Sequence, residues 1–158
     1  LMDERTLHRG AAFAAIGLAV LLLVDLFLAW QEVTVDVAGV VRVNDMASGW
    51  GGFGLIAGAL AIALILLELD NLRLGVEELG RRTIGAVALA LGVFLATTVQ
   101  ALTGDVSVSV ATVGVEVQST RWPAYVGILL ALALVAATLA PFLRTAHAPR
   151  GAMPHRTA

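Results

Sequence analysis

Long apolar runs alternate with short polar segments along the whole chain. A helix that crosses a membrane needs roughly 20 mostly apolar residues. Four runs meet this length and predict helices over residues 11–30, 52–70, 83–102 and 123–143. The first run follows a charged N-terminus, as a signal peptide would. It is longer than a signal core, however, and it lacks a small-x-small cleavage pattern before Gln31. We therefore expect an uncleaved first span.

The segment after the first run alternates valine with polar residues. Period-two alternation of β-branched residues is typical of a half-buried strand. A three-residue turn at residues 38–40 predicts a hairpin over residues 32–46. Its expected cross-strand pairs are Val37 with Val41, Val35 with Val43, and Asp36 with Arg42, the last with opposite charges.

The segment between the third and fourth runs repeats this pattern. A tight turn at residues 111–112 predicts a second hairpin over residues 105–118. Its expected pairs are Val110 with Val113, Val108 with Val115, and Val106 with Val117. We expect the valines of both hairpins to lie on one face of a continuous sheet. That face could be a lid on the protein's own helices or a docking surface for a partner or a second copy. The interaction surface predicted here comprises Val35, Val37, Val41, Val43, Val108, Val110, Val113 and Val115, with Trp50 and Trp122.

Both halves of the chain run helix, valine hairpin, tryptophan, helix. Trp50 is followed by Phe53 and a glycine, and Trp122 is followed by Tyr125 and a glycine. Since each half contains two spans, a duplicated unit would give a parallel repeat about an axis along the membrane normal. The predicted fold is a single membrane domain over residues 1–158: an all-α transmembrane four-helix bundle with a small extracellular antiparallel β-sheet made from two hairpins. The tail, residues 144–158, is expected to be disordered.

Composition supports a membrane protein. Of the 158 residues, 59% are hydrophobic and 14% are charged, whereas soluble domains carry about 25% charged residues. A net charge of −2 argues against binding of nucleic acid, which needs a basic face. Cysteine is absent, and all ten basic residues are arginine. Together with the abundance of alanine, valine and leucine, this indicates a GC-rich bacterial genome.

The arginines predict the orientation. Arg5, Arg9, Arg73, Arg81, Arg82, Arg144, Arg150 and Arg156 fall on one side of the predicted spans, and Arg42 and Arg121 fall on the other. Because positive charge stays on the cytoplasmic side, we expect both termini in the cytoplasm of a bacterium and the hairpins outside its plasma membrane. Trp30, Trp50 and Trp122 then lie at the outer interface, where indoles are favoured.

Asp25 is the one charged residue within the apolar runs themselves, residues 11–30, 46–67, 83–103 and 122–143. Thr97, Thr98 and Gln100 are expected at a similar depth and could donate hydrogen bonds to it, and Arg121 could supply a counter-charge. One interpretation is a carboxylate that handles protons or cations. The other is a structural aspartate that ties the first helix to the third.

Small residues recur at four-residue spacing, as in Gly54 and Gly58, in Ala88, Gly92 and Ala96, and in Gly127 and Ala131. Such spacing allows close helix approach, either within the chain or between copies.

The spans contain no nucleophile–base pair, no set of metal ligands and no cysteine. We therefore expect a non-enzymatic protein without a cofactor, which acts as a structural, assembly or accessory subunit through its helices and sheet. Its expected partners are the lipid bilayer and either further copies or a larger membrane complex. The alternative is a small oligomeric channel or a proton- or cation-coupled transporter that uses Asp25.

The run from Trp30-Gln31-Glu32-Val33 to Gly49-Trp50 resembles small, uncharacterised four-span membrane proteins of GC-rich bacteria. Over residues 10–143 the order of elements also resembles the claudin plan of four helices under an extracellular sheet. The Gly-Leu-Trp motif and the paired loop cysteines of claudins are missing, so this second resemblance concerns architecture alone.

Overall fold

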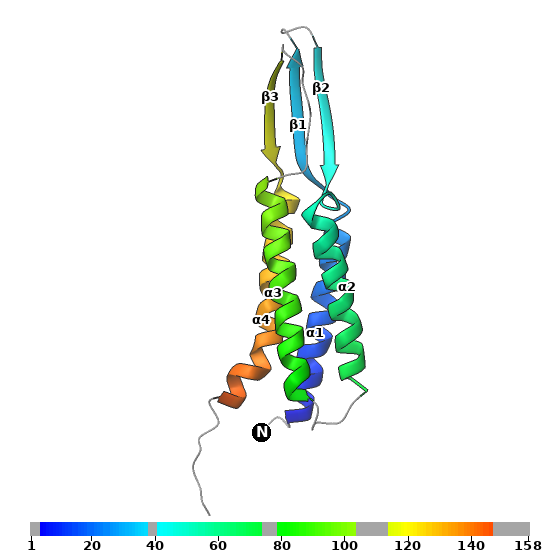
Figure 1. The fold of residues 1–158 in the computed structure, drawn as a ribbon, viewed down its shortest axis with the longest axis vertical. Helices are drawn as coiled ribbons and strands as arrows, with labels where there is room; N and C mark the ends of the chain where they lie inside the picture. Colours follow the sequence, from blue (N-terminus) through cyan, green and yellow to red (C-terminus); the bar gives the residue numbers. More distant parts are fainter. Residues whose placement is uncertain (1–3, 38–40, 74–78, 104–113, 147–158) are drawn as a thin grey trace, which may run out of the picture.

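The computed structural model describes residues 4–37, 41–73, 79–103 and 114–146 (Figure 1). Strand residues 33–45 and 114–119 are described by their backbone. The elements in chain order are α1 (Glu4–Asp25), β1 (Ala29–Val37), β2 (Val41–Ser48), α2 (Phe53–Asn71), α3 (Leu79–Thr103), β3 (Gly114–Thr120) and α4 (Trp122–Ala146). The helices run side by side, and the strands stand on one end of the bundle, extended along its long axis (Figure 1).

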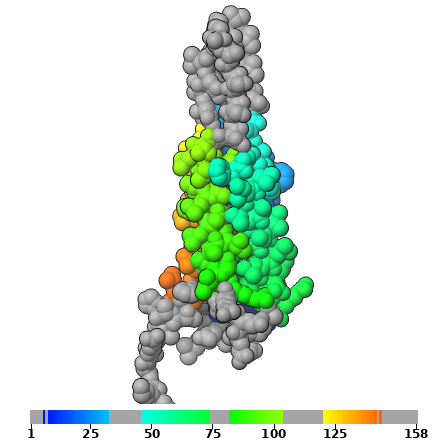
Figure 2. Space-filling model, in the orientation of Figure 1, coloured from blue at the N-terminus to red at the C-terminus, as the bar shows by residue number. Residues whose placement is uncertain are grey.

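The four helices form a closed ring. Each helix packs against its neighbours in sequence, and α4 packs back against α1. Figure 2 shows the face on which α2 and α3 lie together along their length. All four helices are long and apolar enough to cross a membrane. Large apolar side chains such as Phe13, Leu55, Leu95 and Leu129 point outward and are exposed, as lipid-facing residues are. The chain is a four-span membrane protein.

The centre of the bundle is a fully buried apolar layer. Leu22, Leu64, Val93 and Leu134 provide one side chain from each helix and are inaccessible to solvent. Small residues surround this layer and allow the helices to approach closely, among them Ala19 on α1 and Ala90 on α3.

The predicted spans agree with α2, α3 and α4 to within a few residues. The first is wrong at its end, because α1 stops at Asp25 and Trp30 belongs to β1. A turn closed by the Leu28 N–H on the Asp25 carbonyl (2.9 Å) separates the two elements. Apolar periodicity cannot distinguish a helix end from a buried strand start. At the other end of the chain, α4 continues to Ala146, so the first residues of the predicted tail are helical.

The predicted register of the first hairpin is confirmed. β1 and β2 pair antiparallel, with Val35 opposite Val43, Asp36 opposite Arg42 and Val37 opposite Val41. The turn at residues 38–40 lies outside the described residues.

The predicted second hairpin lies mostly outside the described residues, and only its second strand, β3, is described. The described sheet has three strands in the order β2-β1-β3, so β3 pairs with β1. Residues 105–113, with Val108, Val110 and Val113, lie outside the described part. In the β1–β3 register, Val115 is opposite Asp36 and Val117 is opposite Thr34. Directly paired positions share a face of a sheet. The prediction of one valine face is therefore wrong for β3, whose valine positions fall on the side away from Val35 and Val43.

The physical reason lies at the base of the sheet, where β1 and β3 leave the bundle. There the Arg121 N–H donates a hydrogen bond to the Trp30 carbonyl (2.8 Å). This hydrogen bond sets Gln31 opposite Thr120. The alternation of valine and polar residues within each segment does not predict it.

Candidate functional site

The junction between the bundle and the sheet is organised around Trp30. In the β1–β2 ladder, Ala29 pairs with Ser48 and Gln31 pairs with Ala47, so Trp30 is an extra residue in β1. Such a bulge redirects a side chain out of the regular alternation. Trp30 is only 1% exposed, and its indole Nε1–H donates a hydrogen bond to the Asp25 carbonyl at 3.0 Å. The sheet is thus anchored in the bundle by one buried indole.

Two glycines make room for this indole. A Cβ added at Gly49 would lie 2.7 Å from Trp30 Cε2, and a Cβ added at Gly127 would lie 2.5 Å from Trp30 Cζ2. These distances are shorter than real Cβ contacts, so any side chain at either position would displace the ring. Leu26, Ala101 and Ala124 complete the buried cluster around Trp30. We call this arrangement the Trp30 seat.

Hydrogen bonds join the strands to α3 and α3 to α2. Gln31 Nε2 donates to the Gln100 carbonyl (3.3 Å), and the Gly54 N–H donates to Gln100 Oε1 (3.2 Å). Thr120 Oγ1 donates to the Ala101 carbonyl (3.4 Å). The last turn of α3 therefore binds both β1 and β3, as well as the start of α2.

Asp25 lies beside the Trp30 seat and is 5% exposed. Its Oδ2 has no hydrogen-bond partner in the described part of the chain, and neither has Thr97 Oγ1 or Gln31 Oε1. A carboxyl group in such a place could hold a proton or accept a donor that moves toward it.

Three of the four partners predicted for Asp25 are engaged elsewhere, and the fourth, Thr97, makes no side-chain hydrogen bond to a described residue. Thr98 Oγ1 donates to the Phe94 carbonyl of its own helix at 2.7 Å, and the Gln100 side chain bonds to Gly54. Arg121 Nε lies 3.7 Å from Glu32 Oε2, and Arg121 Nη1 lies 3.3 Å from Met46 Sδ. These predicted contacts to Asp25 are wrong because Asp25 points to α4 rather than α3: a Cβ at Gly127 would lie 2.8 Å from Asp25 Oδ2.

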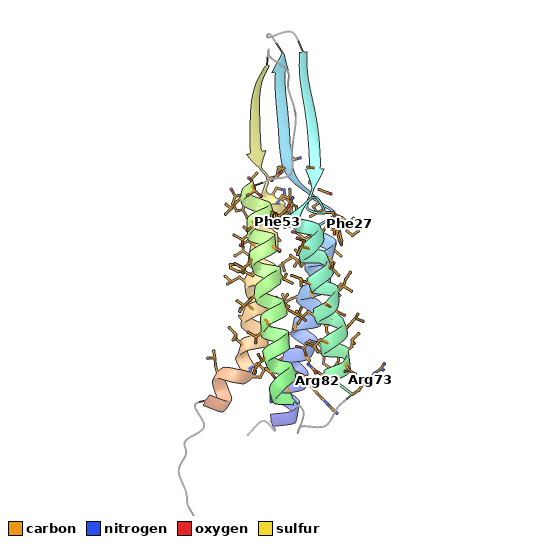
Figure 3. All side chains as sticks on the ribbon, viewed as in Figure 1. Phe27, Phe53, Arg73 and Arg82 are labelled. Carbon is orange, nitrogen blue, oxygen red and sulfur yellow. The ribbon has the colours of Figure 1, made fainter. Side chains whose placement is uncertain are left out.

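The three tryptophans have three different environments. Trp30 is buried, so its indole packs inside the protein and not on its surface. Trp50 is half-buried against Gly58 and stacks in a tilted geometry on Phe27, with ring centroids 5.2 Å apart. Trp122 is 66% exposed. Phe27 and Phe53 mark the sheet end of the bundle in Figure 3, and Arg73 and Arg82 mark the opposite end.

The recurring small residues mostly serve contacts within the chain. A Cβ at Gly54 would lie 1.5 Å from the Gly49 carbonyl oxygen, and one at Gly92 would lie 3.0 Å from Leu60 Cδ1. Gly10 and Gly17 differ, because a Cβ at either would meet nothing within 4 Å.

Among the described residues, three further polar side chains are buried: Gln31, Glu68 and Thr138. Gln31 lies just past the predicted first span and is almost fully buried. Glu68 is buried near the other end of α2, where its Oε2 accepts a hydrogen bond from Asn71 Nδ2 (3.3 Å). Asp70, two residues on, forms an exposed ion pair with Arg82 of α3. The polar run Glu68-Leu69-Asp70-Asn71 is typical of a helix end. The sequence does not show that Glu68 is buried and Asp70 exposed, because that difference depends on how α2 packs against the other helices.

Among the described residues, no three His, Asp or Glu side chains are grouped as metal ligands would be. Comparison of the chain with protein-family models, with curated proteins and with solved structures finds no match.

Proposed function

We propose that this chain is a non-enzymatic subunit that assembles, with further copies or within a larger membrane complex, through its helices and its β-sheet. The observation that carries the proposal is the sheet itself. Its strands extend beyond the bundle (Figure 1), and the buried Trp30 fixes their base. A small sheet held rigidly clear of the helices is suited to contact another protein. The alternating β1–β2 hairpin offers that protein a row of valine positions on one side.

The proposed orientation has the sheet outside a bacterial plasma membrane and both termini in the cytoplasm. In support, one end of each helix lies at the bundle end opposite the sheet (Figure 1). These are the start of α1, the end of α2, the start of α3 and the end of α4. This end carries most of the arginines, and positive charge favours the cytoplasmic side.

The natural absence of cysteine gives a direct test of this orientation. Ser48 at the base of the sheet and Arg73 at the opposite end are both exposed. In intact cells, a membrane-impermeant maleimide should label the Ser48→Cys chain and should label the Arg73→Cys chain only after the membrane is permeabilised. The reverse pattern would invert the proposed orientation.

A duplicated origin of the two halves is part of the same proposal. Asp25, at the end of α1, lies against Gly127 of α4, and Gln100, near the end of α3, lies against Gly54 of α2. In each case a polar residue of the odd helix meets a glycine of the even helix in the other half. Each of these glycines closely follows a tryptophan, Trp50 or Trp122. This reciprocity is expected of a parallel repeat about an axis along the bundle.

The channel or transporter alternative has less support. The buried layer of Leu22, Leu64, Val93 and Leu134 places apolar side chains between the Asp25 end of the bundle and the Glu68 end. An ion crossing this layer would lose its hydration without gaining a ligand, which is costly. A pathway would have to form between copies.

The assembly proposal is tested by mass in detergent. Static light scattering of the purified chain should give a mass above one copy, or a co-purifying partner should be recovered from native membranes. Val43→Glu should reduce that assembly. Asn44→Glu is the matched control, because it adds the same charge at the next position of β2, on the other face of the sheet. A strictly monomeric chain that recruits nothing contradicts the proposal, as does equal loss of assembly in both variants.

A further inference from the structure

Asp25 and Trp30 share one point of contact on α4. A Cβ at Gly127 would lie 2.5 Å from Trp30 Cζ2, 2.7 Å from Trp30 Cη2 and 2.8 Å from Asp25 Oδ2. The carboxyl oxygen and the edge of the indole are therefore pressed against the same stretch of backbone. Both residues are almost fully buried, so the edge of the Trp30 ring occupies space beside this carboxyl oxygen that water would otherwise fill.

No described cation compensates a charge on Asp25. Arg121 and Glu32, at the base of the sheet, pair with each other. The titratable Tyr125 of α4 is largely exposed, and the outer turns of α2 and α3 contribute neutral side chains. The remaining charged positions of the described sheet, Asp36, Arg42, Asp45 and Glu116, belong to rungs farther from the bundle.

A buried oxygen without a partner is tolerable on a neutral carboxyl group and costly on an ionised one. An ionised Asp25 would have to regain water. The side toward Gly127 is closed by backbone, and the side toward the centre is closed by the apolar layer that contains Leu22. Movement of the Trp30 indole, which shares the contact at Gly127, would admit water to this oxygen.

We propose that Asp25 is a proton-binding site that holds Trp30 in its seat, and that loss of the proton to water unseats Trp30 and loosens the sheet from the bundle. The seated state holds one more proton than the unseated state, so it is favoured at low pH and lost as pH rises. For a single proton, the ratio of the two states changes by at most about tenfold per pH unit. Because β1 pairs with both other described strands, its release at Trp30 affects the whole sheet. The site concerns the junction alone and does not depend on whether the chain assembles.

Trp30 itself reports on this site. In a Trp50→Phe, Trp122→Phe chain, reconstituted in phosphatidylcholine vesicles, Trp30 is the only tryptophan. Its quenching by acrylamide is measured from about pH 4 to about pH 9, a range that brackets the titration of carboxyl groups. We expect protection at low pH and a several-fold rise in quenching as pH increases. Asp25→Asn, which is neutral throughout, should stay protected across the range. Glu32→Gln removes the neighbouring carboxyl group and should keep the pH response.

A second measurement does not require the Asp25 variant to fold. Among the described residues, Glu68 is the other buried carboxyl group. In a Glu68→Gln chain, infrared spectroscopy should show a protonated carboxyl band that disappears over the same pH interval in which quenching rises. Uniform protection of Trp30 at every pH, an unchanged response in Asp25→Asn, or the absence of that band would each overturn the proposal.

Discussion

The indole of Trp30 donates its hydrogen bond to the backbone carbonyl of Asp25, the last residue of α1. The chain leaves the bundle after Asp25, makes one turn, and sends the Trp30 side chain back among the helices. This hydrogen bond fixes the direction of β1 relative to the end of α1. Gly49 and Gly127 leave the room that the indole ring needs.

A methyl group at Gly127 should destabilise the fold. Gly127→Ala would overlap both Trp30 and Asp25, and overpacking of a close contact typically costs about 1–3 kcal/mol. In a chain of this size each kcal/mol lowers Tm by about 2–4 °C, so thermal unfolding in detergent resolves the effect. Gly17→Ala is the matched control, because its Cβ would meet nothing within 4 Å. Equal Tm values for the two variants would contradict the seat as described.

Gly54 should be less tolerant than Gly92, although both lie in the small-residue pattern. The new Cβ in Gly54→Ala would meet the backbone oxygen of Gly49 at 1.5 Å, and backbone cannot rotate away. In Gly92→Ala it would meet the end of the Leu60 side chain at 3.0 Å, which can shift. We expect a loss at or above the upper end of about 1–3 kcal/mol for Gly54→Ala and a smaller loss for Gly92→Ala. Guanidinium or heat denaturation in the same detergent ranks them, and the opposite ranking would disprove the contact.

Replacement of the buried and the exposed tryptophan should separate anchoring from lipid contact. Trp30→Phe leaves a gap in the seat and removes the N–H that bonds to Asp25, for an expected loss of about 2 kcal/mol. Trp122→Phe changes an exposed ring and should stay within about 0.5 kcal/mol. Thermal unfolding of both variants in one detergent gives the comparison. A larger effect at Trp122 would show that indole burial is not the source of the stability.

The side chain of Gln100 should matter more than that of its neighbour Thr98. The Gly54 N–H is shared between Gln100 Oε1 and the Gly51 carbonyl. Gln100→Ala removes the first of these hydrogen bonds, for an expected loss of about 0.5–1.5 kcal/mol. Thr98→Val removes only a hydrogen bond to the helix that carries it. Hydrogen exchange of the first turn of α2 should quicken in Gln100→Ala and not in Thr98→Val. Unchanged exchange in both would mean that this bond does not hold the turn.

The sequence predicts the parts of this fold that depend on neighbours in the chain. The pairing of Val35 with Val43 follows from alternation around one short turn, and three of the four spans follow from uninterrupted apolar length. The end of α1 does not follow. Trp30 leaves the helix and packs into the bundle because Gly127 of α4 leaves room for its ring. Gly127 is far away in the sequence, so the residues around Trp30 do not reveal this contact. The face of the sheet on which Val115 lies also depends on a distant contact, the hydrogen bond from the Arg121 N–H to the Trp30 carbonyl.

In the candidate site too, the sequence predicts what depends on chain neighbours and misses what depends on distant residues. Asp25 stands out in sequence as a charge within an apolar run, and the structure buries it. Its surroundings were predicted from depth in the membrane alone, which does not say toward which neighbouring helix a side chain points. Gln100 consequently bonds to α2, and Arg121 pairs with Glu32. The sequence does not indicate that Glu68 is buried, because its neighbours are those of a solvent-exposed helix end.

The Trp30 seat also constrains the order in which the molecule can be completed during synthesis. Its walls come from the segment before α2 and from α4, which is made after the other three described helices. Until α4 enters the membrane, the Trp30 indole of the nascent chain lacks its contacts with α4. Before β3 is made, β1 is paired on one edge only. A chain that stops before α4 would therefore present an unfilled groove and an unpaired strand edge, features by which membrane quality-control proteases and chaperones could distinguish an unfinished copy from a finished one.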